Sequence, residues 1–196
     1  MTSRSMIREL TNKDADKLGR FLSGLSPEVF DVWNRFGFSI DDFSPKETAF
    51  KQCNLVASRE KGFVALNKDR EIIAYSYLRF FPEKKTKSHN ASLGIVVASE
   101  YQGKGLGSRL MQYIHSWARK KGIKKIWLAT YARNKAALHI YRELGYQVEG
   151  LFMYDECGKH GWDHVVSMAL MLDEEFKNAD KERGFVVDEL MKGQRV

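Results

Sequence analysis

Three glycines, Gly103, Gly105 and Gly107, stand at alternate positions in the segment YQGKGLGSRL, directly before a stretch that reads as an amphipathic helix. A loop with so few side chains lets another molecule approach its backbone. The N–H groups at the start of the following helix point outward, and the helix dipole adds partial positive charge there. A strand, a glycine-rich turn and a helix start therefore predict an anion site, and phosphate is the ligand we expect.

Two nucleotide-binding patterns do not fit this loop. The dinucleotide fingerprint G-x-G-x-x-G, started at Gly103, requires a glycine at the position that Ser108 occupies. The Walker pattern fails because no Gly-Lys-Ser/Thr follows at the required spacing. A short glycine-rich turn can also serve only to pack a strand against a helix, and the loop alone leaves that alternative open.

The pattern that does match is Gln/Arg-x-x-Gly-x-Gly/Ala, which residues 102–107 carry as Gln-Gly-Lys-Gly-Leu-Gly. Here the chain resembles the GNAT superfamily of N-acetyltransferases. A second segment, NKAALHIYRELGY from Asn134, is similar to the other signature of that family, with Asn-x-x-Ala, a helical tyrosine at Tyr141 and a Gly-Tyr pair. The resemblance covers roughly residues 6–172 and is strongest over 91–171.

The resemblance implies that the ligand is acetyl-CoA, used as a co-substrate without a metal. Its pyrophosphate would lie on the backbone amides of the glycine loop, and its pantetheine arm would run beside the preceding strand. Lys104 and Arg109 can add positive charge for the phosphates. The expected cofactor-binding residues are Ile95, Val96, Val97, Gln102, Gly103, Lys104, Gly105, Leu106, Gly107, Ser108 and Asn134.

Acetyl transfer from a thioester to an amine needs a neutral amine, stabilisation of the oxyanion and a proton for the departing thiolate. The resemblance implies that Tyr141 donates this proton, although an aromatic residue at helical spacing can also simply pack. Asn134 is expected to cap its helix, and in the family it also contacts the cofactor arm. Backbone N–H groups near Val96 and Val97 would serve the oxyanion if their strand splays from the strand that starts near Lys125.

The sequence does not single out a general base. Family members that acetylate protein N-termini often carry a glutamate five residues before the signature asparagine, and Ala129 stands at that position here. This departure puts a ribosomal-protein type of activity in doubt. A water chain could also carry the proton away. The open candidates for the base are His89, Glu100, Asp155, Glu156, His160 and His164.

The acceptor is expected between the segment YDECGKHGW and the N-terminal helices. Aromatic residues that could line this place are Phe30, Trp33, Phe36 and Phe38, and acidic residues that could attract a cationic amine are Asp31, Asp41 and Asp42. Plain core packing explains the aromatic residues as well. The identity of the acceptor therefore stays open.

The hydrophobic pattern predicts the scaffold for these residues, a mixed α/β domain. We expect a strand at 7–10, helices to about residue 55, a hairpin over 62–81, a strand at 91–98, a helix over 106–122, a strand at 124–131, a helix over 135–144, and antiparallel strands at about 146–154 and 164–172. Thr11 and Asp14 predict a capping box before the first helix. The helix after the glycine loop is expected to bury Leu106, Leu110, Tyr113, Ile114 and Trp117.

The resemblance refines this scaffold. It implies a single GNAT-like domain over residues 1–172, followed by a C-terminal extension over 173–196. Its central sheet is expected to have about seven mostly antiparallel strands, to be flanked by helices and to be splayed at the glycine-loop strand.

The composition fits an ordinary globular chain, because 196 residues with 43% hydrophobic and 12% aromatic residues can build one core. No apolar stretch is long enough for a membrane span, and no signal segment is visible, so a cytoplasmic location is our default expectation. Cys53 and Cys157 lie too far apart for a zinc or disulfide motif. The net charge is +7, but the basic residues are scattered along the chain. We therefore expect neither a nucleic-acid nor a membrane partner.

Four functions remain compatible with the sequence. The leading hypothesis is an acetyl-CoA-dependent N-acetyltransferase that moves an acetyl group to a primary amine of a small molecule or peptide by direct attack in a ternary complex. The alternatives are a non-catalytic module that binds or senses CoA thioesters, an acetyltransferase of protein N-terminal amines, and a nucleic-acid-binding protein. Whether the acyl group is larger than acetyl, and whether the chain forms a homodimer, stays open.

Overall fold

The protein is built on a seven-stranded sheet in the order β1-β2-β3-β4-β5-β7-β6, seen in a computed structural model that describes residues 5–26, 59–81, 84–158 and 161–173. The strands are β1 (Met6–Glu9), β2 (Glu60–Leu66), β3 (Ile72–Phe80), β4 (Asn90–Val97), β5 (Lys125–Tyr131), β6 (Gln147–Gly158) and β7 (Gly161–Met171). Every neighbouring pair is antiparallel except β4 and β5. The expected mixed fold with about seven mostly antiparallel strands is confirmed.

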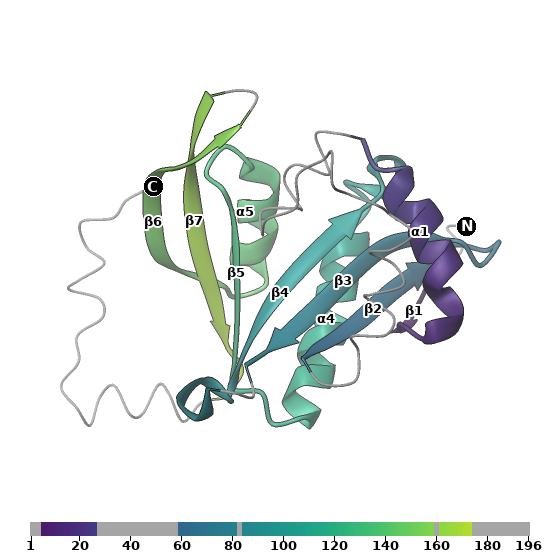
Figure 1. Ribbon diagram of the computed structural model, residues 1–196, viewed down its shortest axis with the longest axis horizontal. Helices are drawn as coiled ribbons and strands as arrows, with labels where there is room; N and C mark the ends of the chain where they lie inside the picture. Colours follow the sequence, from purple (N-terminus) through teal and green to yellow (C-terminus); the bar gives the residue numbers. More distant parts are fainter. Residues whose placement is uncertain (1–4, 27–58, 82–83, 159–160, 174–196) are drawn as a thin grey trace.

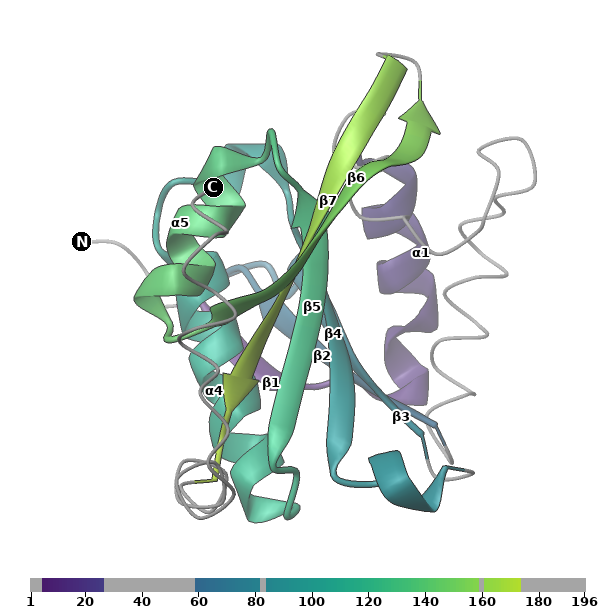
Figure 2. The ribbon, with the colours of Figure 1, turned by 90° about the vertical axis from the view of Figure 1, so that its left-hand side faces the viewer.

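Helices cover both faces of the sheet (Figure 1, Figure 2). Helix α1 (Ala15–Ser23) lies on one face, and helices α4 (Leu106–Lys120) and α5 (Lys135–Glu143) lie on the other. Leu18 and Leu22 of α1 pack with Tyr75 and Val96 of the sheet in one buried cluster. A second and larger cluster joins α4 and α5 to the opposite face. The two clusters fix which side chains of β4 face which helices.

The buried face of α4 differs in part from the expected one. Leu106, Leu110 and Ile114 are buried as predicted, but Tyr113 is 38% exposed, and its ring forms a T-shaped contact with Phe63. The stripe continues instead through Met111, His115 and Ala118, which are all buried. The prediction for Tyr113 was therefore wrong, because the buried stripe is rotated around the helix towards these three residues.

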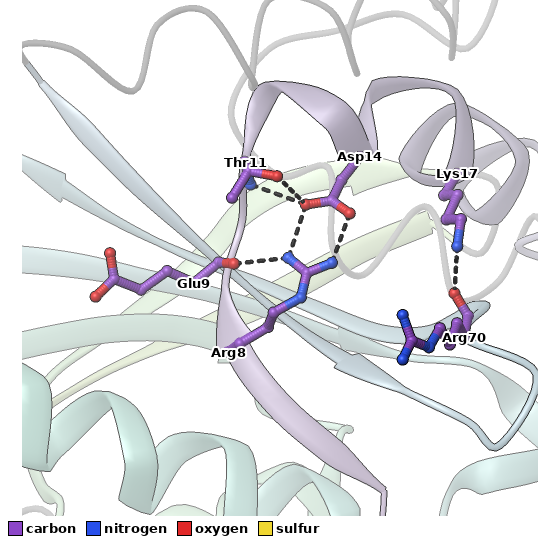
Figure 3. A network of polar contacts seen from close by, with 6 residues as sticks. All are labelled: Arg8, Glu9, Thr11, Asp14, Lys17 and Arg70. Atoms are coloured by element: carbon purple, nitrogen blue, oxygen red, sulfur yellow. Dashed lines mark hydrogen bonds and ion pairs between the residues drawn. The ribbon is translucent and has the colours of Figure 1, made fainter.

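The start of α1 is held by a polar network (Figure 3). Asp14 Oδ2 accepts hydrogen bonds from the Thr11 main-chain N–H at 2.9 Å and from the Thr11 hydroxyl at 2.8 Å. The Arg8 guanidinium donates to both carboxylate oxygens of Asp14. Burial alone would raise the pKa of Asp14, but the hydrogen bonds from Arg8 and Thr11 outweigh it and lower this pKa to about 2. The predicted pairing of Thr11 with Asp14 thus anchors β1 to α1.

The parallel strands β4 and β5 separate soon after they begin. They pair only over three residues, from Asn90 with Lys125 to Ser92 with Trp127, although β4 continues to Val97 and β5 to Tyr131. Figure 1 shows the two strands adjacent at one end and diverging towards the other. The expected splay at the glycine-loop strand is confirmed. The main chain of β4 beyond Ser92 is therefore left without a strand partner on this side among the described residues.

The last two strands are longer than expected. The segment from Asp155 to Trp162 was expected to be a loop, but β6 runs to Gly158 and β7 starts at Gly161. Three residues of β6 lie between Phe152 and Glu156, whereas one residue of β7 lies between their partners Val165 and Asp163, and Tyr154 within this bulge has a φ of 53°. The segment reads as a loop because it contains Gly158 and Gly161, although it continues the hairpin.

Several predictions lie outside the described residues. They are the helices expected over 27–55 with their aromatic and acidic residues, Cys53, His160 and the extension beyond residue 173. The division of the chain at residue 172 stays a prediction for the same reason. Within the described ranges, no helix is both long and apolar enough to cross a membrane.

Candidate active site

The glycine loop forms an open turn between β4 and α4. Gly103 and Gly105 have φ values of +67° and +72°, in the left-handed region that glycine adopts without strain. Gly105 is the N-cap of α4, and a Cβ added at either glycine would meet no protein atom within 4 Å. Among the described residues, no acceptor forms a hydrogen bond with the backbone N–H groups from Gly103 to Ser108. The turn therefore presents unused donors at a helix N-terminus, the arrangement that binds anions.

Polar side chains of the loop and of the first turn of α4 form hydrogen bonds with neighbouring segments. Gln102 Nε2 donates to the carbonyl oxygen of Val97 at 2.9 Å, which ties the loop to the end of the strand. Lys104 Nζ donates to the Glu100 carbonyl at 2.6 Å, and Arg109 donates to the Ser5 hydroxyl at 2.7 Å. Both cations thus stay close to the loop. Gln102 acts here as a positioning residue for the turn.

The backbone of β4 alternates between its two sides. Ala98, just beyond β4, donates its N–H to the carbonyl of Ile73 in β3, so the antiparallel ladder places the main-chain polar groups of Val96 on the β3 side. The N–H groups of Ile95 and Val97 consequently face the side from which β5 has departed. The hydrogen bond from Gln102 to the Val97 carbonyl agrees with this assignment, because this carbonyl is not used by β3. Of the three strand residues expected at the cofactor arm, Ile95 and Val97 therefore offer main-chain groups, and Val96 does not.

Asn134 begins α5 and caps it, as its position predicted. Its Oδ1 accepts the Ala137 N–H at 3.2 Å, and its Nδ2 donates to the Thr130 hydroxyl at 3.3 Å. The side chain thereby links the end of β5 to the first turn of α5. Since β4 leads into the glycine loop and β5 leads into Asn134, the two sequence signatures lie at the ends of the two diverging strands.

Tyr141 lies in the same buried cluster as Leu106. Ile95 and Val97 are partly buried and pack against this cluster. Burial raises the pKa of its hydroxyl to about 12, so the group keeps its proton at neutral pH. Within the described part of the chain its hydroxyl has no hydrogen-bond partner, and its ring contacts Tyr146 at a centroid distance of 5.8 Å. The hydroxyl is therefore available as a proton donor to a bound group.

A buried histidine lies behind this tyrosine pair. A hydrogen bond of 2.9 Å joins His115 Nε2 and the Tyr146 hydroxyl. Burial, with a smaller contribution from the Arg119 guanidinium, lowers the pKa of His115 to about 4. The ring is consequently neutral at pH 7. Sequence reasoning missed this pair, because nothing near His115 along the chain indicates a partner thirty-one residues later.

The neutral state of His115 makes stability depend on pH. Its unfolded pKa is near 6.5 and its folded pKa is about 4, so the unfolded chain binds more protons between these values. The free energy of unfolding that depends on neutral His115 is fully present above pH 6.5. It falls by about 3 kcal/mol in total as the pH drops from 6.5 through 4. Urea unfolding at pH 7 and pH 4.5 should show this loss. His115→Gln should flatten the dependence, whereas Asp14, with a pKa of about 2, titrates below this window.

The candidate bases are mostly engaged in other contacts. Glu156 accepts the Tyr131 hydroxyl at 2.6 Å, and His164 Nδ1 accepts the Tyr154 N–H at 2.9 Å. Asp155 and Glu100 are exposed. None of these groups has geometry that separates it from the others as a base, so the base is not assigned.

Sequence reasoning also missed a polar group beside the splay of β4. Tyr77 on β3 lies across Gly94 of β4, since a Cβ built on Gly94 would come within 2.5 Å of Tyr77 Cζ and 2.8 Å of its hydroxyl oxygen. Arg79 lies over the Tyr77 ring at 5.6 Å and pairs with Glu60 on β2. The sequence predicted the hairpin over 62–81 that contains these residues, but not their neighbours on other strands.

The loop residues fit a diphosphate on the geometry of this structure alone. Six N–H groups without an acceptor among the described residues, two left-handed glycines and open space above them suit a multiply charged anion. Beyond Ser92, the side of β4 that faces β5 has no paired strand among the described residues. This side suits an extended, amide-containing arm that leads away from the loop. No group of metal-ligating side chains occurs in the part of the chain that the structure describes.

The chain is similar in sequence to a known protein family and to individual known proteins. A family model described as the acetyltransferase (GNAT) family matches residues 27–146. The chain is 36% identical over 66 residues to a spermidine N(1)-acetyltransferase of Escherichia coli strain K12, covering 33% of this chain and 36% of that protein. It is 33% identical over 78 residues to a streptothricin acetyltransferase of Streptomyces lavendulae, covering 39% and 41%. The chain thus spans 36% and 41% of the length of these two relatives.

A solved structure extends the likeness over most of the fold. It is a phosphinothricin acetyltransferase from Sinorhizobium meliloti in complex with AcCoA, with a TM-score of 0.74. The similarity covers 89% of this chain and 90% of the other at 18% sequence identity. At this identity the comparison shows a shared fold.

Proposed function

Because this chain belongs to the acetyltransferase (GNAT) family, whose model matches residues 27–146, we propose that it is an acetyl-CoA-dependent N-acetyltransferase acting on a primary amine. The observation that carries the proposal is the glycine loop. Its backbone N–H groups have no acceptor among the described residues, and it follows β4, from which β5 diverges beyond Ser92. The acceptor is a small molecule or a peptide, and it attacks the thioester directly in a ternary complex.

The loop and strand would bind the co-substrate through the main chain. The amides from Gly103 to Ser108 hold the diphosphate, and the groups of Ile95 and Val97 hold the arm along β4. When bound, acetyl-CoA supplies the activated acetyl group. Asn134 keeps the start of α5 fixed to the end of β5, so that the arm lies between two rigid helix starts.

The remaining chemistry would fall to the edge of β4 and to Tyr141. The N–H groups that face away from β3 can donate to the carbonyl oxygen on which negative charge develops. Tyr141 carries a proton at neutral pH and can give it to the departing sulfur. The amine must reach the site in its neutral form, and its surplus proton leaves through water or through the unassigned base.

A direct assay tests this function. We expect free thiol to appear when the purified protein is mixed with acetyl-CoA and a panel of amines comprising spermidine, streptothricin, phosphinothricin and a peptide with N-terminal alanine. Turnover with the peptide alone would identify an acetyltransferase of protein N-termini, despite Ala129. Tight binding of acetyl-CoA without turnover across a wider amine panel would overturn the enzyme and favour a module that senses CoA thioesters.

A further inference from the structure

Tyr77 occupies a special place relative to the splay. It stands opposite Gly94 in the β3–β4 register, and Gly94 is two residues beyond Ser92, the last residue of β4 that pairs with β5. The closeness of the Tyr77 hydroxyl to a Cβ built on Gly94 means that the side chain crosses from β3 onto β4. The hydroxyl therefore lies at the beginning of the gap between the parallel strands.

The side chain is fixed in this position but its hydroxyl is not used. Tyr77 is only 7% exposed and packs with Tyr75 and Val96 in the α1-side cluster. In the ranges that the structure describes, no partner forms a hydrogen bond with its hydroxyl. A ligand that forms a hydrogen bond with this hydroxyl would therefore not have to displace a partner among the described residues.

A charge pair supports the tyrosine from one side. Arg79 lies over its ring and forms an ion pair with Glu60, which is 7% exposed and has its second carboxylate oxygen, Oε2, buried without a partner among the described residues. The pair brings little net charge to the site because its two charges cancel. Burial raises the pKa of Tyr77 more than Arg79 lowers it, and Glu60 raises it further, so the hydroxyl stays neutral.

Tyr77 and the glycine loop approach the gap from opposite faces of the sheet. Tyr77 belongs to the cluster under α1, whereas Leu106 and Tyr141 belong to the cluster under α4 and α5. Beyond Ser92 no ladder joins β4 to β5, so groups on the two faces can meet there. A thioester arriving from the α4 side would then meet an acceptor held on the α1 side.

We propose that Tyr77 forms an acceptor subsite, in which its hydroxyl accepts a hydrogen bond from the neutral primary amine at the start of the β4–β5 gap. This inference rests on the proposed function for the placement of the thioester. A neutral oxygen acceptor suits the task because, unlike a carboxylate, it does not stabilise the protonated amine that cannot attack. Gly94 is required because any larger residue would displace the Tyr77 ring.

Amine binding, measured apart from turnover, tests the subsite. Spermidine, streptothricin, phosphinothricin and the N-terminal alanine peptide are each titrated calorimetrically into the 196-residue protein saturated with CoA. We expect at least one probe to bind the wild type, and Tyr77→Phe to weaken that binding about tenfold, because one hydrogen bond is lost. The affinity for CoA should not change. Tyr75→Phe, on the same strand and face, should leave amine affinity unchanged.

The outcomes separate this inference from the proposed function. Equal amine affinity in wild type and Tyr77→Phe overturns the subsite, and so does the failure of every probe to bind the wild type. Unfolding measurements on both variants show whether a loss of affinity comes from a damaged fold. Amine binding that depends on Tyr77 without release of thiol would support the subsite and contradict the acetyltransferase activity.

Discussion

Replacing Tyr141 by Phe is expected to lower the turnover number of acetyl transfer by about 100-fold or more. The substitution keeps the buried ring and removes only the hydroxyl, which no described residue uses in a hydrogen bond. The pKa of about 12 keeps this hydroxyl protonated, and the departing thiolate is the group that needs a proton. Steady-state kinetics over a range of pH would measure the effect. The KM for acetyl-CoA should change little, because the diphosphate site is elsewhere.

A control separates chemistry from packing. Tyr113→Phe removes a hydroxyl from a half-exposed ring on α4 and should leave the turnover number as it is. If Tyr141→Phe kept wild-type turnover at every pH, Tyr141 would be a packing residue and the proton donor would have to be sought elsewhere.

Gly105→Val is expected to raise the KM for acetyl-CoA by about tenfold or more. The new side chain would project into the open space above the turn, where the diphosphate is proposed to lie. Each lost hydrogen bond to a charged oxygen costs about 1.5–3 kcal/mol, and about 1.4 kcal/mol is a factor of ten. Titration of CoA into the variant would measure the loss without any amine present.

The backbone conformation requires a matched control for this variant. Gly105 has a φ of +72°, and any other residue there adds roughly 1–2 kcal/mol of strain. Gly122 has a φ of +73°, also with nothing within 4 Å of an added Cβ, and it follows the opposite end of α4. Gly122→Val should lose similar stability and keep the wild-type affinity for CoA. Equal affinity in both variants would remove the loop from the site.

Local patterns predicted much of the scaffold. The capping pair of Thr11 and Asp14, the left-handed glycine after α4 and the cap at Asn134 all depend on residues within a few positions of one another. The glycine loop was found for the same reason. Short-range backbone chemistry of this kind can be read along the chain.

Features that depend on distant partners could not be predicted in the same way. His115 is buried because Tyr146 supplies a hydrogen bond, and Tyr77 matters because Gly94 lies on the next strand. Gly158 and Gly161 hid the length of β6 and β7, since glycines are typical of a turn, and the strand pairing beyond residue 155 was not expected. Such pairings are set by register and tertiary packing, which no local window contains.

The most direct test of the proposed co-substrate site is a crystal structure of the protein with bound CoA. We predict diphosphate oxygens within about 2.7–3.2 Å of the backbone nitrogens between Gly103 and Ser108, with the arm lying along Ile95 and Val97. Diphosphate held at another place, or a turn closed by neighbouring side chains while CoA binds elsewhere, would contradict this site.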